Sequence, residues 1–135
     1  MRPKVLLDTD ILSLLRREHE RVTQHAKDYI IIHGRLTFTE LTWYEVVRGY
    51  RAIDAHRQLE IFEAFCQRCN ILPVDHNTLD CAADIYADLH QRGELIGEVD
   101  ILIAGIAFTY GMGVATRNEE HFSRIPGLHV ENWTI

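Results

Sequence analysis

Short apolar runs alternate with longer helical segments along the whole chain, and this alternation limits the possible folds more than any other feature. The runs cover residues 4–7, 36–38, 70–74, 113–116 and 128–130. Runs of this length that are bounded by polar residues are typical of strands, and strands that alternate with helices form parallel sheets. The sequence therefore predicts an α/β sandwich around a small parallel sheet.

The segments between these runs carry apolar residues at the three- and four-residue spacing of amphipathic helices. We predict helices over residues 10–17, 20–32, 40–53, 55–69, 77–91, 99–110 and 118–122. The helix expected at 99–110 is apolar on nearly every side, which predicts that it is buried.

The composition is typical of one folded domain. The chain has 135 residues, 47% of them hydrophobic, and no linker-like segment, so we expect a single domain over residues 1–135. The longest apolar stretch, 101–108, is too short to cross a membrane, and the N-terminus does not resemble a signal peptide. We therefore expect a cytoplasmic protein. Its three cysteines do not suggest a disulfide framework, and Cys66 and Cys69 are expected to be packing thiols.

Three acidic residues that are far apart in the sequence occupy positions that suggest a site. Asp8 directly follows the first strand, Glu45 lies within the helix at 40–53, and Asp100 opens the apolar helix. Ligands of parallel α/β sheets bind beyond the carboxyl ends of the strands, where Asp8 is expected. Each residue also has a purely structural interpretation, because Asp8 and Asp100 could cap helices and Glu45 could be a solvated surface acid.

The neighbours of Glu45 and Asp100 favour a cation site. Both stand beside bulky apolar side chains, where an unpaired carboxylate is costly to bury. If they meet Asp8, their repulsion raises the pKa of at least one carboxyl unless a hard cation lies among them. Oxygen ligands favour Mg²⁺ or Mn²⁺ over Zn²⁺, and such an ion promotes hydrolysis of phosphodiesters. With a net charge of −6, a chain that handles nucleic acid also needs local arginine contacts.

Four segments run in order through nearly the whole chain: VLLDTDILSLL at 5–15, LTWYEVVRG at 41–49, GELIGEVDILIAGIA at 93–107 and VATRNEEHFSRIPGLHVENW at 114–133. Together they resemble the PIN-domain ribonucleases, and more narrowly the VapC toxins of VapBC toxin–antitoxin systems. The resemblance implies a PIN-like three-layer α/β/α sandwich, an acidic pocket that binds Mg²⁺ or Mn²⁺, and endoribonuclease activity that leaves a 5′-phosphate and a 3′-hydroxyl.

By this resemblance, Asp8, Glu45 and Asp100 are the metal ligands, and Asn118 joins them as a catalytic residue. Asp10 replaces the Asn that commonly follows LDT in the family. It either adds charge near the metal or caps the first helix.

The fourth segment departs from the family pattern. Many relatives have TRD or TRN and then, three residues on, an acid, whereas this chain has Asn118 and then His121. The fourth ligand is therefore Asn118, Glu119 or Glu120, or else both glutamates are surface acids at a helix start.

The residues beside these acids suggest contacts with RNA. We expect Arg48, Arg51 and Arg117 either to contact the RNA backbone or to form ordinary ion pairs. Trp43 and Tyr44 are expected to pack in the core rather than to stack on bases.

The resemblance also implies partners. They are a second copy of the chain in a homodimer, tRNA or ribosomal RNA loops as substrate, and a cognate VapB-type antitoxin with a segment that fills the acidic groove. The competing interpretation, suggested by Asn118 and His121, is a non-catalytic PIN module that binds RNA or a protein.

Overall fold

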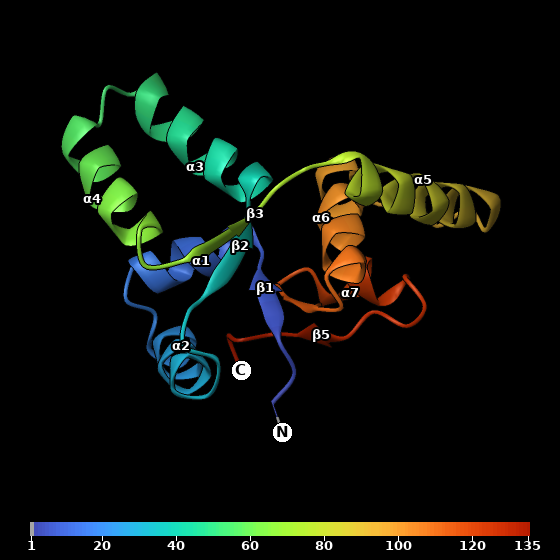
Figure 1. The fold of residues 1–135 in the computed structure, drawn as a ribbon, viewed down its shortest axis with the longest axis horizontal. Helices are drawn as coiled ribbons and strands as arrows, with labels where there is room; N and C mark the ends of the chain where they lie inside the picture. Colours follow the sequence, from blue (N-terminus) through green and yellow to red (C-terminus); the bar gives the residue numbers. More distant parts are fainter. Residues whose placement is uncertain (1) are drawn as a thin grey trace.

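The computed structural model describes residues 2–135, in which helices and strands alternate as predicted (Figure 1). The elements in chain order are β1 (Val5–Leu7), α1 (Thr9–Arg16), α2 (Glu20–His33), β2 (Thr37–Thr39), α3 (Glu40–Ala52), α4 (His56–Cys66), β3 (Asn70–Leu72), α5 (His76–Gln91), α6 (Glu98–Thr109), β4 (Gly113–Ala115), α7 (Glu119–Ser123) and β5 (Val130–Glu131). Within residues 2–135, no helix combines the length and apolar character of a membrane span.

The strands form two small sheets, and every strand pair in them is parallel. β4 lies between β1 and β5, while β2 pairs with β3. β1 and β2 lie side by side, so the two sheets meet at the centre of the molecule. The register sets Leu7 opposite Ala115. Asp8 and Thr116, the next residues along each strand, are therefore neighbours at the carboxyl edge of the sheet.

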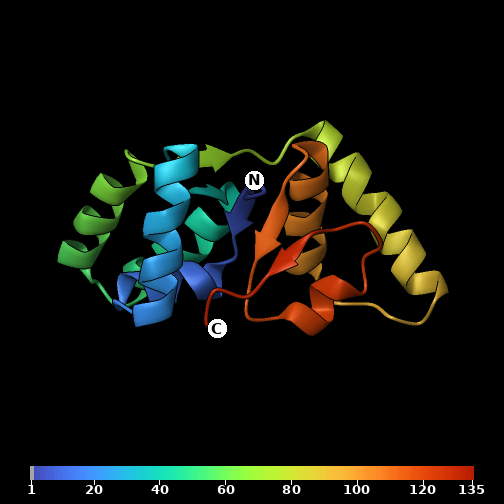
Figure 2. The same ribbon diagram turned by 90° about the horizontal axis from the view of Figure 1, so that it is seen from below.

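Helices cover both faces of these strands (Figure 2). On one face, α1 to α4 pack around a core that includes Leu7, Phe38 and Phe62. On the other face, α5, α6 and α7 pack around a core that includes Leu6 and Phe122. Leu6 and Leu7 serve opposite cores because successive side chains of a strand point to opposite faces. The predicted three-layer α/β/α architecture is confirmed.

Helix α6 is buried against α5, as its apolar composition predicts. Gly105 allows the close approach, because a Cβ atom at this position would lie 2.9 Å from both Ala82 Cβ and the carbonyl oxygen of Thr78. The start of α6 carries Asp100, so this contact helps to fix the position of that carboxylate.

Helix α4 ends earlier than predicted, at Cys66 rather than Cys69. The N–H groups of Arg68 and Cys69 donate across tight turns to Phe65 and Cys66. These turns bring Asn70 to the start of β3. Cys66 and Cys69 are free thiols, and burial of Cys69 raises its pKa to about 11, so their prediction as packing thiols is confirmed.

The prediction for the two aromatic residues of α3 is half right. Trp43 packs against the core formed by α1 to α4. Tyr44 is 56% exposed, and the Arg48 guanidinium lies 5.1 Å from the centre of its ring. Tyr44 is therefore a surface residue, because the apolar side of α3 turns toward Val47 instead.

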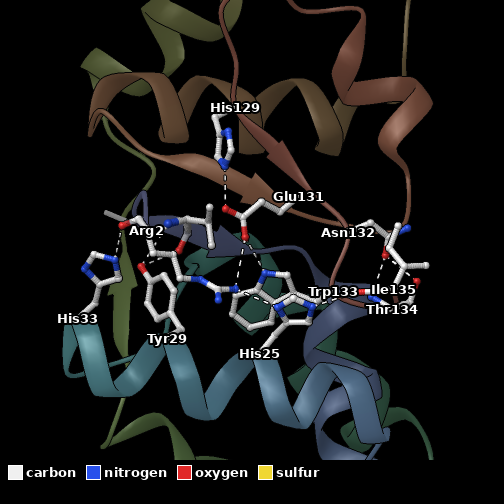
Figure 3. Close-up of polar contacts among 11 residues, drawn as sticks. Arg2, His25, Tyr29, His33, His129, Glu131, Asn132, Trp133, Thr134 and Ile135 are labelled. Carbon is white, nitrogen blue, oxygen red and sulfur yellow. Dashed lines mark hydrogen bonds and ion pairs between the residues drawn. The ribbon is translucent and has the colours of Figure 1, made fainter.

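Arg2 and the C-terminal residues both contact α2 (Figure 3). Trp133 is buried beneath Arg2, and its Nε1–H donates to Glu131 at 2.9 Å. Arg2 Nη2 lies 3.0 Å from His25 Nδ1, and His25 Nε2 lies 3.0 Å from the carbonyl oxygen of Ile135. Because an arginine side chain only donates, Nδ1 accepts and Nε2 carries the proton of a neutral His25 ring.

Candidate active site

One pocket at the carboxyl edge of the strands contains all four predicted catalytic residues. It has a volume of about 350 Å³ and is lined by Asp8, Thr9, Asp10, Ser13, Glu45, Val99, Asp100 and Asn118. The residue that follows β1, the helices α1, α3 and α6, and the loop after β4 each contribute to it. Side chains more than 100 positions apart in the sequence therefore share one concave surface.

Asp8 is the most buried acid of this pocket, with 6% of its surface exposed. Its Oδ1 accepts from the N–H of Thr9 at 2.8 Å, and its Oδ2 accepts from the hydroxyl of Thr116 at 2.8 Å. Asp8 is thus the N-cap of α1 as well as a pocket residue. Burial, reinforced by the charge of Asp10, raises its pKa from 3.8 to about 7.

Asp10 is not the helix cap but a second acid of the pocket. Its Oδ2 accepts from the N–H of Arg117 at 3.1 Å. Its Oδ1 is buried and has no hydrogen-bond partner within residues 2–135. Burial raises the pKa of this carboxyl too. Of the two interpretations from sequence, added charge in the pocket is the one that fits this geometry.

Glu45 reaches the pocket from α3 and is half-buried. Its Oε1 accepts from the hydroxyl of Thr9 at 2.9 Å, and that hydroxyl also lies 3.0 Å from the Thr42 hydroxyl. The Thr9 side chain therefore holds Glu45 beside Asp8.

Asp100 lies in the first turn of α6, where Gly97 is the N-cap and supplies no capping side chain. Its Oδ2 lies 3.3 Å from Nδ1 of His121, the residue that replaces an acid of the family pattern. Asp100 is therefore not the N-cap of α6, and its carboxylate instead contacts His121 of α7.

The three candidates for the fourth ligand differ in whether they line the pocket. Asn118 lines the pocket, and its N–H donates to the Thr116 hydroxyl at 2.9 Å. Glu119 and Glu120 are exposed and are not part of the pocket lining, and Glu120 pairs with Arg124 at 3.0 Å. The geometry favours Asn118 and the interpretation of both glutamates as surface acids.

The side chains that line the pocket have the chemistry of a divalent-cation site. In the part of the chain that the structure describes, no lysine or arginine side chain lies within 4.0 Å of Asp8, Asp10, Glu45 or Asp100. Four carboxylates and one amide make an all-oxygen donor set of the kind that Mg²⁺ and Mn²⁺ prefer. Across residues 2–135, however, no three His, Cys, Asp or Glu side chains are gathered closely enough to hold an ion without adjustment.

None of the three candidate RNA-binding arginines lines this pocket. Arg48 and Arg51 are exposed on α3, and Arg117 is exposed in the loop after β4. In residues 2–135 none of the three forms an ion pair, so the alternative interpretation as ordinary ion-pair partners finds no support. Only Arg117 touches a pocket acid, through its backbone contact with Asp10.

Two threonines of the site were not predicted from the sequence. Thr9 holds Glu45, and Thr116 holds Asp8. The same signal that identified Asp8 applies to Thr116, because both directly follow a buried strand. Hydroxyl groups are common at strand ends, which explains why the pattern alone did not single out this one.

We expect Thr116→Val to shift the pH dependence of RNA cleavage. The substitution removes the hydroxyl that stabilises the ionised form of Asp8, so the pKa of Asp8 rises further and the acidic limb of the rate profile moves up by roughly one pH unit. Cleavage rates measured across pH test this. Thr109→Val, which removes a hydroxyl remote from the pocket, is the control. An unchanged profile for Thr116→Val would contradict the role given to Thr116.

We expect the metal-free protein to lose stability as pH rises through the neutral range. Asp8 titrates near 3.8 when unfolded and near 7 when folded, so folding favours its protonated form. This contribution is complete below about pH 4 and is lost by about pH 8, with an upper bound on the order of 4 kcal/mol. Urea unfolding in EDTA should show Asp8→Asn gaining stability over wild type across this range. If the stability difference between Asp8→Asn and wild type did not change with pH, the raised pKa of Asp8 would be contradicted.

Residues 5–128 match the PIN-domain family. The chain belongs to the PIN-domain family. Its relatives include the tRNA(fMet)-specific endonuclease VapC of Salmonella typhimurium, 28% identical over 96% of this chain and 98% of the relative. Ribonuclease VapC2 of Haemophilus influenzae is 29% identical over 96% of this chain and 98% of the relative.

Solved structures agree with this relationship. The DNA-bound VapBC complex of Salmonella typhimurium contains a chain that superposes with a TM-score of 0.84 at 28% identity, over 98% of this chain and 99% of that chain. The FitAcB structure of Neisseria gonorrhoeae gives a TM-score of 0.79 at 27% identity, over 96% and 97% of the two chains.

Proposed function

We propose that this protein is a divalent-metal-dependent endoribonuclease, the toxin of a toxin–antitoxin pair, that hydrolyses RNA phosphodiesters in the cytoplasm. The observation that carries the proposal is the pocket in which Asp8, Asp10, Glu45 and Asp100 gather, with no lysine or arginine side chain of residues 2–135 within 4.0 Å of any of them. Full-length similarity to proteins named VapC ribonucleases supports it.

Mg²⁺ is the proposed ion, with Mn²⁺ as an alternative. Asp8, Glu45 and Asp100 would hold it, and Asn118 would add its carbonyl oxygen or orient a water molecule. When bound, such an ion supplies an activated water and offsets negative charge on the phosphate. The hydroxyls of Thr9 and Thr116 keep two of the acids in position for this task.

The RNA substrate would approach over exposed arginines of α3 and of the loop after β4. Arg48, Arg51 and Arg117 would contact backbone phosphates, because a guanidinium binds phosphate oxygens in pairs. The name of the Salmonella relative specifies tRNA(fMet) as its target. For this chain we propose loops of tRNA or ribosomal RNA, cut to leave a 5′-phosphate and a 3′-hydroxyl.

The test is cleavage of total cellular RNA by purified protein freed of any antitoxin. Mg²⁺ or Mn²⁺ should support cutting, EDTA should stop it, and sequencing of the fragment 5′ ends should give discrete sites. The competing proposal is a non-catalytic PIN module, motivated by Asn118 and His121 in the fourth segment. RNA binding without cutting under every metal condition would favour that module.

A groove next to the acidic pocket suits the antitoxin. It has a volume of about 570 Å³, shares Thr9, Ser13 and Glu45 with the pocket, and runs between α1, α3 and α4. Ile53 and Ile61 line it and are 73% and 53% exposed. We propose that an apolar antitoxin segment lies here and extends a basic side chain toward the carboxylates. The VapBC complexes among the related structures support such a partner, and a homodimer of this chain is proposed with it.

We expect Ile61→Asp to weaken inhibition by the cognate antitoxin by at least about 10-fold, because a charge would enter an apolar contact. RNA cleavage by the free toxin should stay unchanged, since Ile61 is outside the acidic pocket. Inhibition curves for wild type and variant measure the effect. Ile31→Asp, on the exposed side of α2, is the matched control. Equal inhibition of all three proteins would exclude this groove as the antitoxin site.

A further inference from the structure

A second cavity lies at the opposite ends of the strands from the acidic pocket. It has a volume of about 460 Å³ and is lined by Lys4, Tyr29, His33, Arg35, Thr37, Cys69, Asn70, Ile71, Leu72 and Met112. Lys4 directly precedes β1, Met112 directly precedes β4, and Asn70 begins β3. The cavity therefore occupies the amino edge of the sheets, whereas Asp8 and Asn118 lie at the carboxyl edge.

The lining of this cavity is basic although the whole chain has a net charge of −6. Lys4, His33 and Arg35 line it, and no aspartate or glutamate does. Within residues 2–135, no carboxylate lies within 4.0 Å of the Lys4 or Arg35 side-chain nitrogens. Cys69 adds no negative charge, because burial raises its pKa to about 11. The positive charges of this cavity are thus uncompensated.

Two of the basic side chains are held in place by the fold. Arg35 Nη1 donates to the carbonyl oxygen of Gln67 at 3.1 Å, which leaves the other N–H groups of the guanidinium for a ligand. His33 Nε2 donates to the carbonyl oxygen of Arg2 at 2.9 Å, and its ring packs beside Tyr29 with the ring centres 4.6 Å apart (Figure 3). An anchored guanidinium and a lysine that line the same cavity can both bind phosphate oxygens.

We propose that this basic cavity binds a backbone phosphate of the RNA substrate as a second contact, remote from the acidic pocket. The proposal rests on the proposed ribonuclease function and deepens it. Because the two sites lie at opposite edges of the sheets, only an RNA long enough to extend across the molecule can occupy both. The cavity would therefore strengthen binding of a tRNA-sized substrate and leave binding of a short oligonucleotide unchanged.

The test compares Lys4→Gln/Arg35→Gln with a control of equal charge change, Arg21→Gln/Lys27→Gln, which alters exposed residues of α2 outside the cavity. Binding to a folded tRNA is measured by fluorescence anisotropy at several salt concentrations, with Asp8→Asn added to each protein so that the RNA stays intact. The cavity variant should bind about 3- to 10-fold more weakly, and the magnitude of its log–log salt slope should fall by about 1. The control should match the parent.

Two further arms separate the possible outcomes. With Asp8 intact, cleavage of a short single-stranded RNA should be the same for wild type and both double variants. Failure of wild type to cut total cellular RNA with Mg²⁺ or Mn²⁺ would overturn the proposed function, independently of the binding result. Inorganic phosphate is titrated against wild type and the cavity variant. Unchanged affinity for tRNA, or an equal loss in the control, overturns the proposal. Phosphate binding without any effect on tRNA overturns it as well, and would make the cavity a small-anion site.

Discussion

Asp8→Asn is expected to reduce metal-dependent RNA cleavage by at least about 1,000-fold, the largest effect on activity of any single substitution in this protein. Asp8 is the most buried acid of the pocket, and the change removes its charge while the amide oxygen can still accept from the N–H of Thr9, the bond by which Asp8 caps α1. The fold should therefore persist while the pocket loses the ligand at its centre. Single-turnover cleavage with saturating Mg²⁺ measures the loss.

The control for this experiment is Asp80→Asn, which removes one negative charge from an exposed position on α5. It should cut RNA at the wild-type rate. If Asp8→Asn retained more than about a tenth of the wild-type rate while thermal unfolding confirmed an intact fold, Asp8 would have no part in holding the ion.

A large loss of stability is expected from Gly105→Val. A side chain at this position collides with Ala82 Cβ and with the backbone of Thr78 and Ala82, so α5 must move away from α6. Such overpacking between two buried helices should cost about 3 kcal/mol or more of the free energy of unfolding. Because α6 carries Asp100, any folded fraction should also cleave RNA more slowly. Urea unfolding measures the first effect.

Gly49→Ala supplies the comparison, since a Cβ there meets no atom within 4 Å and α3 should gain roughly 0.5 to 1 kcal/mol from the better helix former. Equal stability of Gly105→Val and wild type would show that α5 and α6 tolerate a wider separation than this packing implies.

The sequence predicted every strand and helix of residues 2–135, because the helices have a periodic apolar pattern and the strands are short apolar runs with polar boundaries. The predictions were less accurate where tertiary contacts determine the end of a helix or the exposure of a side chain. Helix α4 ends at Cys66 because the chain must turn toward β2 so that Asn70 can pair with Thr37. No residue near Cys66 gives a sequence signal for this end. The surface position of Tyr44 depends in the same way on how α3 is rotated against its neighbours.

The acids of the site were predictable because a carboxylate at a strand end, or inside an apolar helix, is costly without a partner. The hydroxyls that hold them were not, since threonine is common in both strands and turns. The role of Asp10 could not be predicted either, because an aspartate at this position is equally consistent with capping α1 and with lining the pocket. Only the contact between Asp8 and the Thr9 N–H shows which aspartate is the cap.

The central claim is that the pocket of Asp8, Asp10, Glu45 and Asp100 holds a divalent cation. Calorimetric titration of the metal-free protein with Mn²⁺ tests it most directly, because it requires no RNA. The account predicts saturable binding that EDTA reverses and that weakens by at least about 10-fold in Asp8→Asn/Asp100→Asn. Wild type that binds no Mn²⁺, or binds it no more tightly than this double variant, would contradict the account.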